Sequence, residues 1–534
     1  MSKKRKNTPV ETGIVAEYVL IWLVKAYVFL MLVVFPLYYR DKYYDMCDAK
    51  WLFFRNVSAF FGVAAVVVFL WYAACFLAEK KLKVFLRNAY HNINVTDRFV
   101  FAYLIVCCVS TLITPCRRFV IWGYSGWYMG LIAQVSFVLL YFLVSRFWRW
   151  DATHLLLFFL AAFVVFFLGV IMRFRIDPLK MYVDLDEYYI QHFLSTLGQV
   201  TWYSGYLCMI CPLGLVAYWC AQKLWQRIVS GIFIGMSFMS VVTQNSDSAY
   251  MAIAGTFFML FWISFASDEK FLRFLECCII ALASFKGMGL LQILYAERMV
   301  GLDPLSVFMS QSAVTLVLLV VVILLYLFLR YVAVQRAGFQ IASWKRLRAV
   351  ALVLVILGGI GVVLYISLNT AGVLPEQFLS KSGYLVFDDH WGNNRGVSWR
   401  CSAEAFLKGD VVRKLFGAGP DSFAEYLYTG YREDFERILG KETIQACAHN
   451  EWLNTLINLG ILGLVTYFGI FLSAFRDCMK GADKYPYLYG AAIAIVAYIV
   501  HNVFCYQQII GTPTIFILMG MAQSVKRYGD GDEL

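Results

Sequence analysis

Apolar runs of helix length follow one another along almost the whole chain, and short polar connections separate them. A helix needs about 20 residues to cross a hydrocarbon layer of about 30 Å. Because the runs are continuous and do not alternate, they favour membrane-spanning helices over the strands of a closed barrel. We predict fourteen such helices, at residues 14–36, 51–78, 98–114, 127–146, 153–172, 201–219, 229–245, 249–266, 274–295, 311–330, 349–367, 454–474, 487–505 and 508–525.

The composition agrees with this pattern. Of the 534 residues, 61% are hydrophobic and 15% are charged, which is too apolar for a soluble protein of this size. The sequence therefore predicts an all-α polytopic membrane protein. It divides into an N-terminal transmembrane bundle (1–367), one large extracytoplasmic loop that carries short helices (368–453) and the C-terminal transmembrane helices (454–534).

Basic residues predict the orientation, because short cytoplasmic loops of membrane proteins are rich in lysine and arginine. With the initial MSKKRK in the cytoplasm, eight basic segments fall on that side, whereas TPCRRF and RFRIDPLK fall on the other. We therefore expect a protein of the cytoplasmic (inner) membrane with both termini in the cytoplasm. Glu17 and Lys25 interrupt the first apolar run and no cleavage site follows it, so we expect that helix to be retained.

The charge and the cysteines argue against nucleic-acid binding and against a cysteine metal site. The net charge of +11 is spread over the connections between apolar runs and forms no aromatic–basic module, so we expect membrane lipids and no nucleic acid as partners. The 14 cysteines lack the spacing of metal ligands. Cys401 and Cys447 share the large loop, which leaves a disulfide between them as an open alternative.

The connection at 368–453 is far longer than the others, and long connections often carry function. SWRCSAEAFL and DSFAEYLYTGYREDFERIL have helical spacing, and FGAGPDSF predicts the turn between them. FDDHWG contains Asp388, Asp389 and His390. Three adjacent side chains cannot all converge on one ion, so we favour a turn over a metal site there.

An ordered series of residues runs through this loop into the next apolar run. It consists of Arg395, Trp399, Gly417, Gly419, Pro420, Phe423, His449, Asn450, Leu453, Gly460 and Gly463. The series, at residues 385 to 475, resembles the O-antigen ligase and polymerase superfamily of bacterial surface-glycan assembly. Members often carry an earlier Ser-Arg-Gly stretch whose arginine helps to hold a lipid diphosphate. The equivalent stretch here is TQNSDSAYMA, which has Asp247 in place of the arginine.

The resemblance implies a membrane glycosyltransferase. Such an enzyme moves a glycan from a polyprenyl-diphosphate carrier to a hydroxyl of a glycan or lipid acceptor on the outer face of the membrane. We expect no cofactor, and no metal either, because the loop lacks a carboxylate–histidine ligand pattern and its arginines can take the place of a cation. Arg395 suits the diphosphate, because guanidinium is permanently charged and matches phosphate oxygens in a two-pronged geometry. His449 suits proton acceptance from the hydroxyl. We assign catalysis to these two residues and substrate binding to Trp399, Arg400 and Asn450.

Simpler interpretations of the same residues stay open. His449 and Asn450 also suit a helix cap with an interfacial anchor, and Arg395 also suits a lipid headgroup. Gly460 and Gly463 are expected to let another helix approach closely. Four charged or polar residues lie within the apolar runs: Glu17, Lys25, Lys286 and His501. Three interpretations stay open for them, namely lining a path, pairing between helices, and snorkelling from a shallower position.

A flippase or exporter of the same lipid-linked glycans is the alternative function. Such a transporter should concentrate polar residues at the middle of the membrane and often shows related halves. The chain shows no internal repeat, and its polar residues gather in one loop. These features favour an enzyme. Ligase and polymerase differ in the acceptor, which the series does not specify.

Overall fold

The computed structural model describes residues 9–81, 83, 87, 90–335, 344 and 346–529. Helices make up nearly all of its regular structure. Two short strands, β1 (Phe193–Leu194) and β2 (Gly198–Gln199), pair antiparallel. The predicted cytoplasmic ends, 1–8 and 530–534, lie outside the described residues, so their placement stays a prediction.

Eleven described helices are long and apolar enough to cross a membrane. They are α1 (Pro9–Phe29) continued by η1 (Leu30–Val34) and α2 (Phe35–Leu37), α3 (Met46–Ala78), α5 (Val95–Ile113), α7 (Ala152–Met172), α9 (Val200–Cys220), α10 (Leu224–Thr243), α11 (Asp247–Ser264), α12 (Asp268–Leu294), α14 (Ala313–Gln335), α15 (Arg346–Thr370) and α19 (Glu451–Gly481).

Three predicted spans coincide with shorter helices. These are α6 (Leu131–Phe147), α20 (Leu488–His501) and α21 (Thr512–Tyr528), of 17, 14 and 17 residues. Every predicted stretch therefore overlaps a helix, but the predicted number of fourteen spans is not confirmed. Most residues of α20 and α21 are buried against neighbouring helices, so packing stabilises them despite their length.

Short helices fill the connections. They are α8 (Glu187–His192), η2 (Ala296–Arg298), α13 (Pro304–Gln311), η4 (Glu376–Phe378), α16 (Trp391–Lys408), α17 (Val411–Phe416) and α18 (Phe423–Leu439). The helices predicted from SWRCSAEAFL and DSFAEYLYTGYREDFERIL are confirmed as parts of α16 and α18. The predicted turn between them is confirmed by the positive φ of Gly417 and Gly419.

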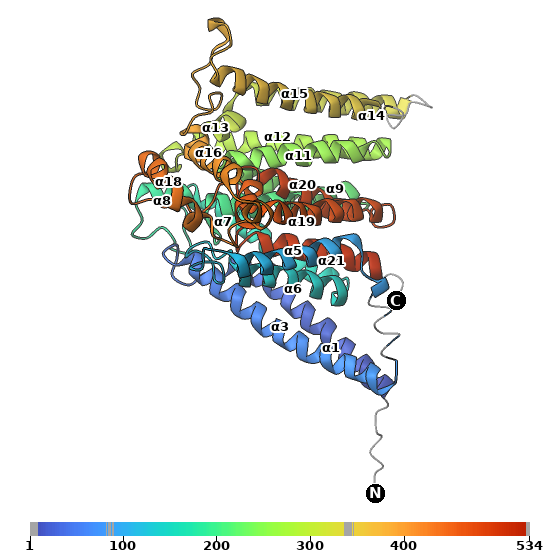
Figure 1. Cartoon of the computed structure of the whole chain (residues 1–534). Coiled ribbons are helices and arrows are strands. Elements are labelled where there is room, and N and C mark those ends of the chain that lie inside the picture. Colours follow the sequence, from blue (N-terminus) through green and yellow to red (C-terminus); the bar gives the residue numbers. More distant parts are fainter. Residues whose placement is uncertain are drawn as a thin grey trace.

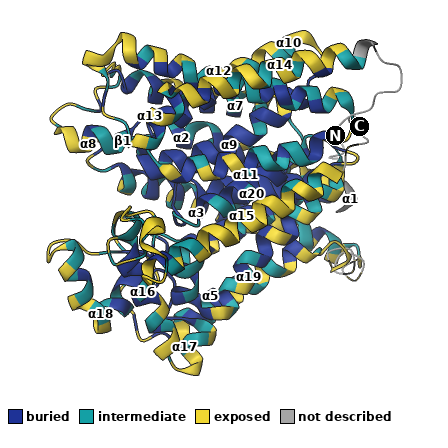
Figure 2. Ribbon diagram, turned by 90° about the horizontal axis from the view of Figure 1, so that it is seen from above, coloured by how far each residue is buried: buried dark blue, intermediate teal, exposed yellow. Residues whose placement is uncertain are grey.

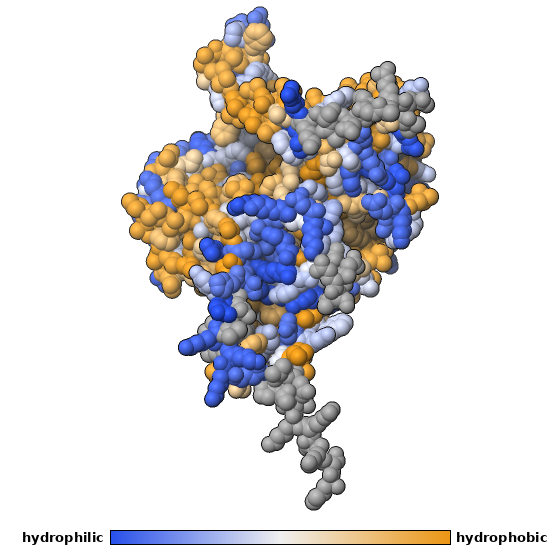
Figure 3. Space-filling view, turned by 90° about the vertical axis from the view of Figure 1, so that its right-hand side faces the viewer, coloured by the Kyte–Doolittle hydropathy of each residue, from blue (hydrophilic) through white to orange (hydrophobic). Residues whose placement is uncertain are grey.

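The long helices lie side by side in a stack, with α14 and α15 at one edge and α1 and α3 at the other (Figure 1). The short helices α8, α16 and α18 gather at one end of the stack, which we call the loop end. The end opposite to it carries a broad hydrophilic area (Figure 3). Arg146 and Arg527 pair there with the buried carboxylate of Asp97, at 2.7 and 2.8 Å.

Burial is concentrated in the middle of the stack, around α9, α11 and α20 (Figure 2). Inside α9, 83% of the apolar stretch is buried, whereas no part of the corresponding stretch of α15 is. Leu354, Val363 and their neighbours on α15 are exposed. A surface of this kind is costly in water and is normal in contact with lipid chains. The fold therefore fits a multi-pass membrane protein.

The charged residues predicted within apolar runs have partners. The contacts join Lys25 Nζ to Asp151 Oδ2 at 2.8 Å, Arg149 Nη2 to Glu17 Oε1 at 3.3 Å, and Lys286 Nζ to the carbonyl oxygen of Ser312 at 3.1 Å. These contacts favour pairing over a path, and the partners Arg149, Asp151 and Ser312 all lie in connections between helices. The cysteines are all free, so the alternative of a disulfide between Cys401 and Cys447 is not realised.

Candidate functional site

The two halves of the motif meet at the loop end. The backbone amides of Ala418 and Gly419 donate to the carbonyl oxygens of Ile457 and Asn458 in α19, at 3.0 and 2.8 Å. Gly460 has φ +68° and interrupts α19, and a Cβ there would lie 2.4 Å from the backbone of α17. Gly460 thus lets another helix approach closely, as expected, and that helix is the short α17. The glycine turn and the start of α19 form one unit.

His449 lies directly before α19. Asn450 is the N-cap of this helix, and its side chain accepts a hydrogen bond from the amide of Leu453 at 3.0 Å. His449 itself has φ +49°, which is uncommon for a residue with a bulky side chain and persists where the surroundings fix it. The cap and this turn point the imidazole out of the helix, toward neighbouring elements.

Two aromatic rings enclose the His449 imidazole. The ring centre of Tyr506 lies 5.0 Å away and that of Trp127 lies 6.2 Å away, both edge to face. The Nδ1 atom of His449 is buried and has no hydrogen-bond partner among the described residues. Buried polar atoms in folded proteins nearly always have a partner. This nitrogen is therefore placed to bind a ligand group or water.

The protonation of His449 follows from the same surroundings. Burial, with the nearby Arg395 charge as the second cause, lowers the pKa of the imidazole from 6.5 to about 3. The ring is thus neutral near pH 7. A neutral imidazole keeps one nitrogen as an acceptor and can take up a proton.

Arg395 approaches from the first turn of α16. Gly392, Asn393 and Asn394 precede it with φ between 60° and 64°. Its Nη1 donates to the carbonyl oxygen of Gly392 at 2.7 Å. Its Nε is buried and unpartnered in the described part of the chain, where Arg395 also forms no ion pair with a carboxylate. The guanidinium is thus held in place by one backbone contact and keeps free donors for an anion.

Trp399 connects α16 to the residue before His449. Its indole Nε1 donates to the carbonyl oxygen of Ala448 at 3.0 Å. Its ring lies 5.0 Å from that of Trp391 and stacks on Phe504 at 6.2 Å. These contacts place Trp399 where it fixes the backbone beside the imidazole.

Arg400 is occupied by carboxylates. It binds Asp389 through Nε and Nη2, at 2.7 and 3.0 Å, and it also contacts Glu404 and Asp434 at 3.2 and 2.9 Å. These contacts raise the pKa of the Arg400 guanidinium, and Arg400 in turn holds the pKa of Asp389 below its usual range. The network ties the start of α16 to α18, so Arg400 is engaged within the loop.

The FDDHWG segment forms a turn, as the sequence favours. The amide of His390 donates to Oδ1 of Asp388 at 2.9 Å. Among the described residues, no group of three or more histidine, cysteine, aspartate and glutamate side chains is arranged to hold a metal ion.

Two acidic residues near His449 are not among the predicted site residues. Glu451 is 2% exposed; its carboxylate accepts from Thr455 at 2.8 Å and from the amide of Gln507 at 2.7 Å. Asp421 accepts from the amides of Tyr124 and Met129, at 2.7 and 2.9 Å. Burial raises the pKa of Asp421 to about 6.

Glu451 and Asp421 hold two loops against the start of α19. Glu451 joins the 502–511 connection, and Asp421 joins the 114–130 connection that carries Trp127. The sequence offered one signal for each residue: Glu451 directly follows His449 and Asn450, and Asp421 directly follows Pro420 in the glycine turn. The backbone amides that they bind, those of Gln507, Tyr124 and Met129, are more than 50 residues away in the chain, and a sequence pattern does not reveal such contacts.

Asp247 and His501 lie on the α16 side of the site. The hydroxyl of Tyr384 donates to Asp247 at 3.5 Å, and the Arg395 charge interacts with Asp247, His501 and Cys505. His501 Nε2 lies 3.0 Å from Ser204 Oγ. Arg395 therefore has an aspartate for a neighbour where the resemblance leads one to expect a second arginine.

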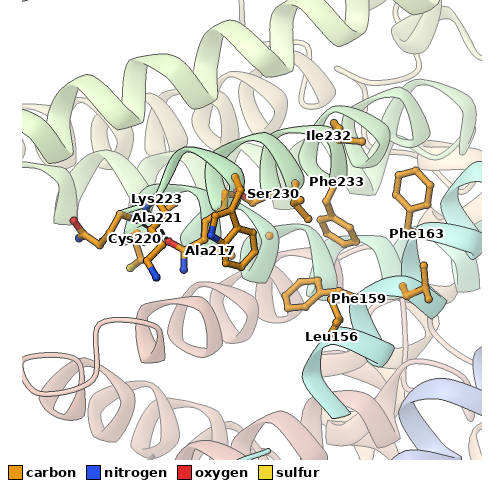
Figure 4. A pocket seen from close by; sticks show the side chains of 16 residues that line it. Leu156, Phe159, Phe163, Ala217, Cys220, Ala221, Lys223, Ser230, Ile232 and Phe233 are labelled. Atoms are coloured by element: carbon orange, nitrogen blue, oxygen red, sulfur yellow. Dashed lines mark hydrogen bonds between the residues drawn. The ribbon is translucent and has the colours of Figure 1, made fainter. Parts of the chain in front are cut away.

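Two large cavities lie among the described residues, one between the long helices and one at the loop end. A cavity of about 690 Å³ lies between α7, α9 and α10, far from the motif. Phe159, Phe163 and Phe233 line it, with Lys223 toward one side (Figure 4). A second cavity of about 600 Å³ lies at the loop end, between the 114–130 connection and α18.

Residues 299–468 match the family model described as O-antigen ligase. This match confirms the resemblance to the O-antigen ligase superfamily. The matched O-antigen ligase region runs from α13 into α19 and includes Arg395, Trp399, Arg400, His449 and Asn450. No curated protein matches the chain. This part of the chain is thus similar to O-antigen ligases, a family associated with surface-polysaccharide biosynthesis.

Proposed function

We propose that the protein transfers a glycan from a polyprenyl-diphosphate carrier to an acceptor hydroxyl at the outer face of the cytoplasmic membrane, with 368–453 as its extracytoplasmic part. One observation carries the proposal. The Nδ1 atom of His449 and the Nε atom of Arg395 are both buried and unpartnered among the described residues, within electrostatic reach of each other. A candidate proton acceptor and a candidate anion binder thus lie close enough for the charge of one to affect the pKa of the other.

In the proposed step, the acceptor oxygen forms a bond to the anomeric carbon and the bond from that carbon to the diphosphate oxygen breaks. The hydroxyl proton passes to His449, and the electron pair leaves with the diphosphate, which remains on its lipid. Arg395 stabilises the negative charge that develops on the leaving group. A diphosphate is already a good leaving group, so alignment and charge stabilisation supply most of the catalysis.

The two residues also act on each other. Without the donor, the Arg395 charge adds to burial and keeps the pKa of His449 low. A bound diphosphate would neutralise that charge, because opposite charges at short range offset each other. The imidazole then becomes a stronger base only when the donor is present. This coupling disfavours proton uptake in the empty site.

The other predicted site residues support these two. Asn450 caps α19 and Trp399 holds Ala448, so both position the imidazole. Arg400 is engaged with carboxylates and stabilises the loop. We therefore propose positioning roles for Trp399 and Asn450, and a structural role for Arg400 in place of substrate binding.

A transporter is the less favoured alternative. In the described residues, Lys25 and Glu17 are paired between helices, and the cavity between α7, α9 and α10 is apolar. Neither forms a polar path through the membrane. The proposal is tested by substituting His449 and Arg395 separately and measuring donor binding and glycan transfer for each variant. Enzymatic transfer requires both residues, whereas transport of the lipid-linked glycan without transfer would favour the alternative.

A further inference from the structure

Aromatic rings and charged groups together line the second cavity, at the loop end. Phe119 and Tyr124 come from the 114–130 connection, and their ring centres lie 4.9 Å apart. Tyr428 faces them from α18. The polar lining includes Arg118, Glu425 and Arg432. We call this cavity the α18 cleft.

The polar groups of the cleft are held by the protein itself. The guanidinium of Arg118 lies over Phe119, 4.9 Å from the ring centre, and that of Arg432 lies 5.9 Å from the ring centre of Tyr428. The carboxylate of Glu425 accepts from the backbone amide of Arg118 at 3.2 Å. The cleft thus combines aromatic ring surface, part of which the guanidinium groups cover, with hydrogen-bonding groups of both charges.

Sugars have matching surfaces. The C–H faces of a sugar ring pack on aromatic rings, and the hydroxyls around the ring accept and donate hydrogen bonds. An acyl chain would fit an apolar cavity such as the one between α7, α9 and α10. A diphosphate would need converging cations without a carboxylate, and Glu425 opposes it. The lining therefore favours a saccharide over a lipid chain or an anion.

Both walls of the cleft connect to the surroundings of His449 through one or two further residues. Tyr124 stands three residues before Trp127, whose ring contacts the imidazole. On the other wall, the Tyr428 hydroxyl accepts from the amide of Gln445 at 2.8 Å, and the Gln445 side chain donates to the carbonyl oxygen of Cys447 at 3.2 Å. A ligand in the cleft would therefore contact the two segments that also hold the surroundings of His449.

The direction of approach distinguishes donor from acceptor. Arg395 reaches His449 from α16, whereas the cleft reaches it from α18 and the 114–130 connection. A single displacement with inversion at the anomeric carbon places the hydroxyl and the leaving diphosphate on opposite sides. We propose that the α18 cleft binds a sugar unit of the acceptor and presents its hydroxyl to His449; the assignment to the acceptor rests on the proposed function.

The first test measures binding to the purified full-length protein. The probe is the mixture of oligosaccharides released by mild acid from the surface polysaccharide of the source cell, titrated while tryptophan fluorescence is recorded. Phe119→Ala removes one ring, and Glu425→Gln removes the charge but keeps an acceptor for the amide of Arg118. Phe378→Ala is the matched control, because Phe378 is exposed and lies in 368–453, the segment that contains Glu425. We expect each cleft variant to bind about tenfold more weakly than the control.

The second test measures transfer. The KM for the acceptor should rise about tenfold in both cleft variants, with the KM for the donor and kcat unchanged. A change in donor KM alone would overturn the acceptor assignment, and unchanged probe binding in both variants would overturn the cleft as a sugar site. If the wild-type protein binds the probe in the cleft but transfers nothing, the saccharide site stands and the proposed function fails. Glu425→Gln keeps the test decisive if Phe119→Ala does not fold.

Discussion

Replacing Arg395 by alanine removes the group that we propose for the diphosphate. A guanidinium has five N–H donors, and the structure uses one of them, from Nη1 to the carbonyl oxygen of Gly392. The Nε atom is buried and unpartnered within the described part of the chain. The remaining donors are thus available to an anion without breaking an ion pair of the protein.

The expected magnitude follows from these contacts. Hydrogen bonds to a charged group contribute about 1.5–3 kcal/mol, which corresponds to donor binding weakened about 10- to 150-fold. Arg395→Lys should recover only part of this loss, because one ammonium does not reproduce the two-pronged geometry. Arg395→Ala should also raise the pKa of His449, because the Arg395 charge, together with burial, lowers that pKa in the wild-type protein.

The assay is equilibrium binding of the lipid-linked donor to the purified variants. Arg437→Ala is the matched control, because Arg437 lies in the same segment, is 61% exposed and pairs with Asp389 and Asp434. The control should bind the donor like the wild-type protein. Donor binding by Arg395→Ala that equals the control would refute the assignment of Arg395 to the diphosphate.

Three further predictions concern the topology, the pH dependence and the loop. Reporter fusions at Gly430 and at the last residue, Leu534, should give opposite signals, and equal signals would contradict the placement of 368–453 outside. Because the pKa of His449 in the free protein is about 3, kcat/KM should show no titration near pH 6.5. A step there whose midpoint matches the titration of the His449 ring followed by NMR would contradict a buried neutral imidazole. The same shift means that the unfolded chain binds more protons between pH 3 and 6.5, so the contribution of His449 to stability falls as the pH drops through this range. Arg400→Ala should lower the free energy of unfolding by about 1 kcal/mol and leave donor binding intact, as measured by thermal unfolding and donor titration; lost donor binding at unchanged stability would return Arg400 to the substrate site.

The helices could be predicted from the sequence because their signal is local. Apolar runs such as 249–266 predict α11 (Asp247–Ser264) to within about two residues. The short helices of the large loop follow from local spacing in the same way. The number of spans could not be fixed, because α20 and α21 depend on burial by neighbours more than on their own length.

The site was only partly predictable, because much of it is built by distant segments. The motif identifies Arg395 and His449 by their order in the chain. It does not reveal that Asp421 binds the amides of Tyr124 and Met129, or that Trp127 then contacts the imidazole. Arg400 has the charge of a phosphate ligand, and only its contacts with three carboxylates show how that charge is used.

The most direct test of the central claim is the transfer activity of His449→Ala in a cell that lacks the wild-type copy, combined with donor binding by the purified variant. We predict that the variant inserts into the membrane and binds the lipid-linked donor like the wild-type protein, because imidazole contributes little to holding a diphosphate. We predict no glycan transfer, since the acceptor hydroxyl has lost its base. Normal transfer by His449→Ala would contradict the account and reduce His449 to an anchor at the start of α19.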